Sequence, residues 1–162
     1  MDTYYYSIDS YYYHGPSPYL TDESRNPSYY QTSNPSSTSN AFSDFDGKGN
    51  TTKIVKERNN PFYAAECCNA YYTEGTKKTQ WYLPSIGELG YLMVKLRTIN
   101  SSIVKIMNIY NYGLTLKTNS AGYWSSTEYD SENAFYIHTT NNNVYYPSKT
   151  DEYNVRAFLR VK

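Results

Sequence analysis

The run AFYIHTTNNNVYYPSK, residues 134–149, decides the fold class because its hydrophobicity alternates with the period of a β-strand. Phe135 and Ile137 occupy every second position, and Tyr136 and His138 stand next to them. Successive side chains of a strand point to opposite faces of a sheet, so this pattern predicts that Phe135 and Ile137 are buried. We expect Tyr136 and His138 to face outward and to be exposed.

Strands are also predicted on both sides of this run. YWSSTEY at 123–129 begins the predicted sheet, NVYYPSK at 143–149 pairs with the central strand, and VRAFLRV at 155–161 completes the sheet. The turn Asn141-Asn142 joins the central pair, because asparagine tolerates the left-handed backbone that a tight hairpin requires. The C-terminal part of the chain therefore predicts a small antiparallel sheet.

A helical pattern precedes the sheet in WYLPSIGELGYLMVKLRTINSSIVKIM, residues 81–107. Ser85 and Glu88 have the spacing of a capping box, in which each side chain bonds to the backbone of the other residue. Apolar residues then recur at helical spacing and predict one buried stripe, formed by Ile86, Leu89, Leu92, Met93, Leu96 and Ile99. Helices followed by antiparallel strands predict an α+β protein.

A shorter helix is predicted in FYAAECCNAYY, residues 62–72, where Pro61 can take a first-turn position and Gly75 ends the region. Cys67 and Cys68 are adjacent, so they form neither an ordinary disulfide nor a metal-ligand spacing. We interpret them as small buried residues of this helix.

The segment around Asp44 and Asp46 predicts a turn, followed by a helix that begins near Thr52 and is capped by Asn50 or Thr51. The alternate spacing of the two aspartates resembles the start of a calcium loop. A lysine holds the third ligand position, however, and no glutamate closes the loop. The turn and cap are the favoured interpretation, and calcium binding near the two aspartates stays open.

The chain divides into an N-terminal segment, residues 1–41, and one domain, residues 42–162. The first segment is rich in Tyr, Ser, Asn and Pro, which predicts strand or loop, with a partly disordered tail as the alternative. The start of the chain lacks the charged and apolar regions of a signal peptide, and no apolar run approaches the length of a membrane span.

Tyrosine dominates the aromatic composition, with 22 Tyr against 5 Phe and 2 Trp. A buried phenol must find a hydrogen-bond partner, so we expect many of these tyrosines to be partly exposed, as on adaptable binding surfaces. The 15 basic and 15 acidic side chains give a formal net charge of zero, which provides no basic field to attract nucleic acid. Composition therefore favours recognition of something other than nucleic acid.

No catalytic constellation is found in the sequence. His14 and His138 are its two histidines, and neither has the neighbouring cysteine or carboxylate spacing of a metal site. Ser125, Ser126 and Thr127 lack the surroundings of a nucleophilic serine, and we expect their hydroxyls to bond to backbone. The sequence predicts no enzymatic activity, no cofactor and no metal.

The frame WYLPSIGELGYL … YWSSTEY … AFYI … V … K … VRAFLR resembles a bacterial and phage family. It is similar to the C-type-lectin-fold domains related to the formylglycine-generating enzyme, which include the C-terminal domain of bacterial collagen-like adhesins. The resemblance covers the chain from about Phe42 to its end and implies two helices packed on a small twisted antiparallel sheet. It implies core positions for Trp81, Leu83, Leu89 and Leu92 in the helical part, and for Trp124, Phe135, Ile137, Val144, Val155 and Phe158 in the sheet.

Two branches of the family are not supported by these residues. The oxidase branch needs a cysteine pair in its C-terminal active site, and residues 122–162 contain no cysteine. The acidic-amide motif with which animal lectins bind sugar through calcium is also absent.

Within the family, the sequence looks most like the variable proteins of diversity-generating retroelements, in which adenines of chosen codons are rewritten. The resemblance implies a variable region at 123–154, where such codons yield residues such as Asn, Tyr, Asp, Ser, Thr and His. Glu132 and Glu152 depart from this pattern, because changing the two adenines of AAC does not reach glutamate. The implied ligand-binding residues are Tyr129, Asp130, Glu132, Asn133, Tyr136, His138, Thr140, Asn142, Asn143, Tyr145, Tyr146, Asp151, Tyr153 and Asn154.

The sequence thus predicts a non-enzymatic recognition domain that binds a protein or glycan target on a cell surface, without membrane insertion. The resemblance implies display on a bacterial surface, secretion, or a place on a phage particle. A glycan-binding adhesin domain of fixed specificity is the alternative. A polar sheet face without a ligand and a degenerate relative of the oxidase branch are further interpretations, and the oligomeric state stays open.

Overall fold

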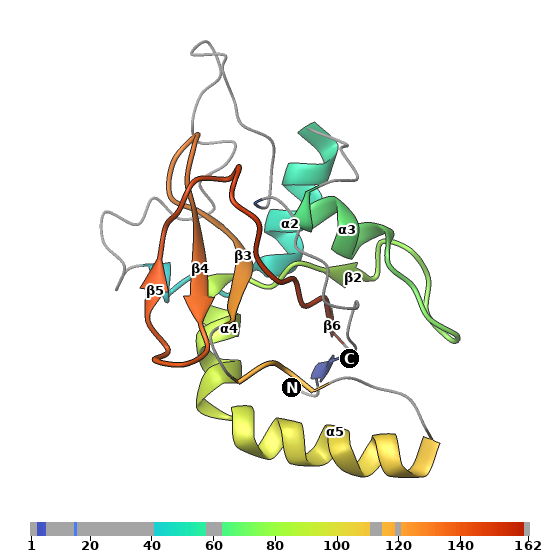
Figure 1. The fold of residues 1–162 in the computed structure, drawn as a ribbon. Helices are drawn as coiled ribbons and strands as arrows, with labels where there is room; N and C mark the ends of the chain where they lie inside the picture. The colour runs from blue at the N-terminus through green and yellow to red at the C-terminus, as the bar shows by residue number, and fades with distance from the viewer. Residues whose placement is uncertain are drawn as a thin grey trace.

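The computed structural model describes residues 3–5, 15, 41–57, 63–110, 115–118 and 121–160. Within these ranges four helices and six short strands form an α+β fold (Figure 1), which confirms the predicted fold class. The expectations for Pro61, for His14 and for most of the segment 1–41 lie outside the described residues. None of the described helices has the length and apolar character needed to cross a bilayer.

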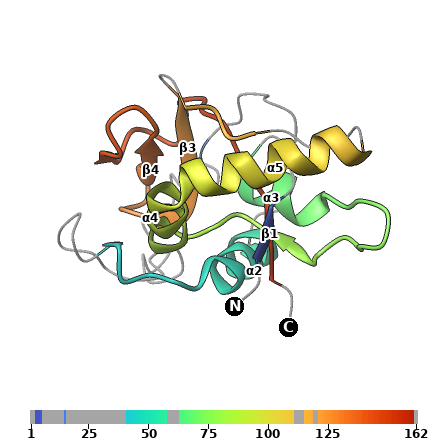
Figure 2. The same ribbon diagram turned by 90° about the horizontal axis from the view of Figure 1, so that it is seen from below.

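The predicted capping box is confirmed, but the single helical pattern predicted at 81–107 forms two helices. α4 (Ile86–Val94) begins directly after Ser85, whose hydroxyl accepts from the Glu88 N–H, while the Glu88 carboxylate accepts from the Ser85 N–H at 3.0 Å. The helix ends at Lys95, whose backbone N–H bonds back into the last turn of α4. α5 (Leu96–Tyr110) then continues across the base of the molecule, as the view from below shows (Figure 2).

α2 (Gly47–Glu57) begins before the predicted start near Thr52, so that boundary is wrong. Asp46 provides the reason, because its carboxylate accepts a backbone N–H of the first turn at 3.0 Å and thereby stabilises an earlier start. Asn50 and Thr51, the predicted caps, instead lie within α2, and both are buried in the protein interior. Their side chains are used in tertiary hydrogen bonds.

α3 (Ala64–Ala70) contains the two cysteines, both of which are free thiols. Cys68 is buried, as predicted, and Cys67 is half-buried. Burial, and to a smaller extent the neighbouring Cys67, raises the pKa of the Cys68 thiol. The protonated thiol of Cys68 therefore packs as a small apolar group.

The six described strands form two three-stranded antiparallel sheets. The order of the first sheet is β1-β6-β2, with β1 (Thr3–Tyr5), β6 (Phe158–Arg160) and β2 (Trp81–Tyr82). The order of the second is β3-β4-β5, with β3 (Gly122–Glu128), β4 (Ala134–His138) and β5 (Val144–Tyr145). The second sheet confirms the three consecutive strands predicted from the period of two.

The expectation that VRAFLRV completes the C-terminal sheet is wrong. β6 pairs instead with β2, where Phe158 lies opposite Tyr82, and with β1 at its other edge. After β5 the chain crosses beside β3, where Tyr123 and Asn154 form a parallel bridge, before it joins the other sheet. This crossing leaves β5 at the edge of its sheet, as far as the described residues extend.

The β3-β4-β5 sheet is covered on both faces. One core cluster joins it to α4 and α5 and includes Ile86, Leu89, Leu92, Ile103, Phe135, Ile137 and Phe158. The other joins it to α2, α3 and β2 and includes Ile54, Ala64, Cys68, Trp81, Leu83, Trp124, Tyr136 and Val155. The predicted core residues are therefore confirmed, except that Leu96, Ile99 and Val144 are only partly buried.

Candidate recognition surface

The turn between β4 and β5 presents three consecutive asparagines to solvent. Asn142 has the left-handed φ of 55° that the predicted hairpin turn requires. Asn141 holds the turn with its side-chain oxygen, which accepts the Asn143 N–H at 3.0 Å. The amides of Asn141 and Asn143 also donate to the hydroxyl of Tyr145 at 3.3 and 3.4 Å. These donors, Asn143 first, lower the pKa of the exposed Tyr145 phenol.

Tyr145 belongs to a stack of three tyrosine rings. Its ring centroid lies 5.5 Å from that of Tyr136 with an interplanar angle of 23°, and Tyr136 stacks on Tyr153 at 4.3 Å and 12°. The indole of Trp124 meets Tyr153 and Tyr136 edge-on at 5.1 and 6.1 Å. A Cβ at Gly122 would lie 2.6 Å from the Tyr136 ring, so a glycine is needed beneath the stack.

The expectation that Tyr136 is exposed is wrong, because only 9% of its surface is accessible. Its side chain does point away from the face of Phe135, as the alternation predicts. That second face is covered by Trp124 and Tyr153, however, and belongs to the second core cluster. Tyr136 therefore supports the exposed Tyr145 ring from within the core.

A second stack lies on the opposite face of β4, around Phe135. Tyr129 and Tyr146 stack at 4.3 Å with an angle of 16°, and both rings meet Phe135 edge-on at 5.6 and 6.1 Å. Tyr146 keeps 48% of its surface exposed, while Tyr129 is half-buried. Each face of the strand pair thus carries one exposed tyrosine backed by a more buried ring.

The loop after β3 is held by one carboxylate. Asp130 Oδ1 accepts the backbone N–H groups of Glu132 and Asn133 at 2.8 and 2.7 Å, and the Asn133 amide donates to both carboxylate oxygens at 3.0 Å. Asp130 and Asn133 are therefore engaged in shaping the loop. Glu132 projects into solvent between them.

Asn154 is also placed differently from expectation, since only 4% of its surface is accessible. Its amide donates to the Gly122 carbonyl at 3.0 Å, and its oxygen accepts from Lys117 Nζ at 2.8 Å. These bonds fix the parallel bridge beside β3 and leave Asn154 little surface for a ligand.

All fourteen predicted site residues lie within the residues that the structure describes, and they differ in solvent accessibility. Two are buried, Tyr136 and Asn154. The half-buried ones are Tyr129, Asp130, Asn133, His138 and Tyr153. The exposed ones, which we call the exposed set, are Glu132, Thr140, Asn142, Asn143, Tyr145, Tyr146 and Asp151. Asn141 was not among the predicted site residues, although its position in the turn next to Asn142 indicated that it would be exposed.

The hydroxyl-rich stretch of β3 is structural, as expected. Ser125 donates to the Phe135 carbonyl at 2.7 Å, and Thr127 donates to the Asp44 carboxylate at 2.7 Å, with both side chains buried. At the end of β3, Glu128 Oε1 lies 3.0 Å from Lys149 Nζ in a fully buried ion pair. Sequence analysis did not identify this pair, although a lysine belongs to the quoted frame.

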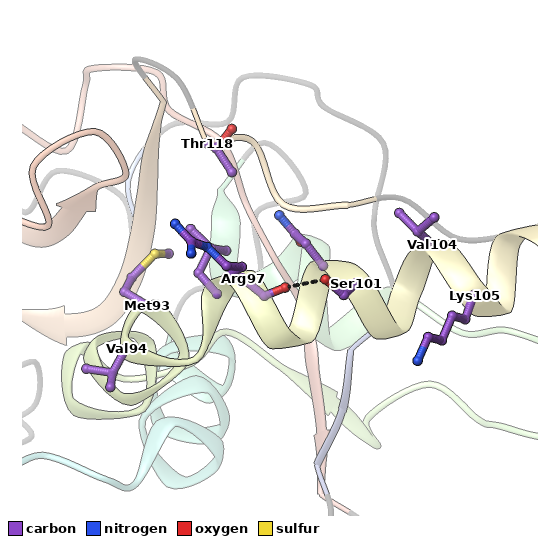
Figure 3. A pocket seen from close by; sticks show the side chains of 9 residues that line it. Met93, Val94, Arg97, Ser101, Val104, Lys105 and Thr118 are labelled. Carbon is purple, nitrogen blue, oxygen red and sulfur yellow. Dashed lines mark hydrogen bonds between the residues drawn. The ribbon is translucent and has the colours of Figure 1, made fainter.

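Most residues of the exposed set do not line either of two surface pockets. The larger, of about 740 Å³, follows α4 and α5, where Met93, Arg97, Ser101 and Val104 line it (Figure 3). None of the fourteen predicted site residues lines this pocket, and all fourteen are described. A smaller pocket of about 380 Å³ beside α4 includes Asn142 in its wall.

The environment of Asp44 and Asp46 is a hydrogen-bonded network. The Asp44 carboxylate accepts from Asn50 Nδ2 at 2.8 Å, from Thr127 Oγ1 at 2.7 Å and from the Asp46 N–H at 3.0 Å. In the described part of the chain, no three His, Cys, Asp or Glu side chains converge as metal ligands would. The network joins α2 to β3.

The α+β fold with two small antiparallel sheets is similar to that of one solved protein in particular. It resembles a fimbrial protein from Bacteroides ovatus ATCC 8483, with a TM-score of 0.52 and 19% sequence identity. The alignment covers 99% of this chain and 34% of the other, so the chain spans about a third of that protein's length. No protein-family model and no curated protein matches the sequence. At this identity the likeness concerns the fold alone.

Because of the stacked Tyr136, we expect the free energy of unfolding to fall at alkaline pH. Burial, followed by the adjacent Tyr153, raises its pKa to about 12. Tyrosine in an unfolded chain ionises near pH 10, so the stability from this shift is present below pH 10 and is lost as pH rises towards 12. We expect this group to lower the free energy of unfolding by about 1 kcal/mol between pH 10 and 11.

Urea denaturation of the wild type and Tyr136→Phe at both pH values measures this difference. The Phe variant should lose less stability on going to pH 11, whereas Tyr145→Phe, which changes the exposed phenol, should not lessen the loss. Parallel losses in the wild type and Tyr136→Phe would contradict the prediction.

Proposed function

We propose that this chain is a non-enzymatic recognition domain with a C-type lectin-like fold, related to the variable proteins of diversity-generating retroelements. The exposed set binds a protein or glycan target, and the frame beneath it holds the fold. Display on a bacterial cell surface or a phage particle belongs to the same proposal. It involves neither nucleic acid nor membrane insertion.

One observation carries this proposal: exposed, chemically varied side chains stand directly on a buried aromatic frame. Tyr145 rests on Tyr136, and Tyr146 rests on Tyr129 and Phe135. Exposed substitutions usually change stability by less than about 0.5 kcal/mol, so such positions can vary without loss of the fold. Tyrosine and asparagine also supply contact area and adaptable hydrogen bonds at low entropic cost.

The structural neighbour supports the place of display. That protein is described as fimbrial, and this chain aligns over nearly its whole length with about a third of it. A recognition domain within a larger surface protein agrees with this arrangement. The part of the proposal that concerns the retroelement rests on the sequence frame.

Sequencing the 3′ end of this gene and its flanking DNA in many copies from one population tests the proposal. We expect codon changes at the exposed set, together with an adenine-containing template copy and a reverse transcriptase gene nearby. Codons for the buried Trp124, Phe135, Lys149 and Val155 should be unchanged, because their side chains form the frame. Uniform copies without a template would contradict diversification.

Uniform copies would favour the second candidate, a glycan-binding adhesin of fixed specificity. The exposed ring of Tyr146, supported by Tyr129, favours this candidate because an aromatic face is a suitable platform for a sugar ring. A glycan array then separates the cases. Binding of one oligosaccharide that Tyr146→Ala abolishes, with an unchanged melting temperature, would establish the adhesin.

A further inference from the structure

The larger pocket, which we call the α4–α5 groove, is apolar and lies apart from the exposed set. Its volume is about 740 Å³, and its apolar side chains are those of Met93, Val94, Leu96 and Val104. Val94 keeps 77% of its surface accessible and Val104 keeps 44%, so both valines face solvent. The groove therefore presents apolar surface that a partner can remove from water.

One wall of the groove is the segment 115–118, which Asn100 holds against α5. The Asn100 amide donates to the Leu116 carbonyl at 3.1 Å, and its side-chain oxygen accepts the Leu116 N–H at 2.9 Å. Leu116 is buried, and Thr118 of the same segment lines the groove across from α5 (Figure 3). Because one side chain fixes both hydrogen bonds, the walls are positioned before a partner binds, which lowers the entropic cost of binding.

The charges at the groove are all positive. Arg97 and Lys105 are the charged members of its described lining, which includes no carboxylate. The sequence of residues 89–127 also contains Lys95 and Lys117 but no aspartate or glutamate. Arg97 and Lys105 are exposed, and within the described residues neither forms an ion pair. This face therefore attracts an anionic partner and repels the same face of a second copy.

The two cations and the apolar side chain between them follow one side of α5. Arg97, Ser101, Val104 and Lys105 share this side, because residues four, seven and eight positions apart lie near one another on a helix surface. Arg97 and Lys105 are about 12 Å apart along the helix axis. A second helix has the same rise, so carboxylates two turns apart on it can meet both cations while apolar side chains between them enter the groove.

We propose that the α4–α5 groove binds an amphipathic helix of a partner protein, with two carboxylates two turns apart and apolar side chains between them. The groove contains no residue of the exposed set, so this inference goes beyond the recognition function proposed above. A lipid surface is disfavoured by the packing of α5, because its apolar stripe of Ile99, Ile103 and Met107 is turned into the core. A helix that binds a bilayer needs such a stripe to enter the lipid.

Three alanine-rich peptides of about twenty residues, a length that forms helices, test this inference. The first has two glutamates seven positions apart and two leucines between them on the same face. The second replaces both glutamates with glutamine, and the third replaces both leucines with alanine. Each is titrated into the isotope-labelled full chain, and NMR reports the affinity and the residues contacted.

We expect the first peptide to shift the signals of Arg97, Ser101 and Val104. It should bind about threefold to tenfold more tightly than the glutamine peptide, because each exposed ion pair contributes modestly. It should bind at least about tenfold more tightly than the peptide without leucine, because the leucines bury apolar surface.

Matched variants distinguish this groove from general attraction between charges. Arg97→Gln and Lys105→Gln should each weaken binding of the glutamate peptide about threefold and leave binding of the glutamine peptide unchanged. Val104→Ser should weaken binding of both peptides about threefold. Lys53→Gln removes an exposed lysine from α2, which Figure 1 shows in the opposite half of the molecule from α5, and should leave binding unchanged. Circular dichroism verifies that each variant is folded.

Several outcomes overturn the inference. Equal binding of the glutamate and glutamine peptides would leave an apolar groove without preference for carboxylates. Equal weakening by Arg97→Gln and Lys53→Gln would indicate diffuse attraction. Absence of any shift at about 1 mM peptide would exclude this class of partner. Sedimentation of the chain with phosphatidylglycerol vesicles, or its dimerisation, would assign the groove to a lipid surface or a second copy if Val104→Asp abolished it. Codon variation in the gene concerns the exposed set, so the two proposals can fail separately.

Discussion

Replacing Lys149 with methionine is expected to lower the free energy of unfolding by about 3–5 kcal/mol. The Nζ atom of Lys149 lies 3.0 Å from Glu128 Oε1 and donates to the Ser131 carbonyl at 3.1 Å, and both charged side chains are fully buried. Methionine keeps most of the side-chain volume but leaves the Glu128 carboxylate in the interior without this cation. Urea denaturation followed by the fluorescence of the buried tryptophans Trp81 and Trp124 measures the change.

Two further variants show whether charge or packing is responsible. Adding Glu128→Leu to Lys149→Met removes the remaining charge and should recover most of the lost stability, because an apolar pair of similar volume often replaces a buried ion pair without cost. Lys53→Met changes an exposed lysine of α2 in the same way and should alter stability by less than about 0.5 kcal/mol. A loss below about 1 kcal/mol for Lys149→Met would refute the assigned role.

The position of Lys149 explains why a lysine belongs to the frame inside the predicted variable region. Its backbone N–H donates to the Glu132 carbonyl at 2.8 Å, and its own carbonyl accepts from Gly15 at 2.8 Å. A Cβ at Gly15 would lie 2.7 Å from the Cα of Lys149, so the two backbones are in close contact. Lys149 thus joins the loop after β3 to the N-terminal segment.

Local sequence signals predicted the elements whose structure depends on local interactions. The capping box of Ser85 and Glu88 forms at the predicted place, and the alternating residues of β3 and β4 form strands. Asn142 adopts the predicted left-handed turn. Each of these features depends on a few neighbouring residues, whose types therefore indicate the structure directly.

Two of the errors concern tertiary contacts, which no local sequence period indicates. Alternation indicates that Tyr136 and Phe135 lie on opposite faces, but it does not show that Trp124 and Tyr153 cover the second face. In the same way, β6 has the pattern of a strand, while its partner β2 was predicted as the start of a helix. Half of the predicted site residues are exposed. The period of two indicates which residues share one face of a strand, but it does not indicate whether other residues cover that face.

Replacing Asp44 with alanine is expected to destabilise the protein by about 3–4 kcal/mol, since it removes the acceptor of three hydrogen bonds to a charged group. Its carboxylate accepts from Asn50 Nδ2, Thr127 Oγ1 and the Asp46 N–H, at 2.7 to 3.0 Å. Asn50 and Thr127 are buried, so water cannot readily replace the lost acceptor. Thermal and urea unfolding of Asp44→Ala measure the loss.

Asp46→Ala is the matched control, because it removes a second carboxylate from the same segment. Asp46 is exposed and its carboxylate accepts a hydrogen bond from the first turn of α2, so the loss of this carboxylate should cost about 1 kcal/mol, as for other helix caps. The same variants decide the question of calcium. If hydrogen bonds alone stabilise this segment, adding calcium or a chelator should not change the melting temperature of the wild type. A rise with calcium that both variants abolish would instead assign a metal-binding role to the two aspartates, and Asp44 would then act as a ligand as well as the acceptor that joins α2 to β3.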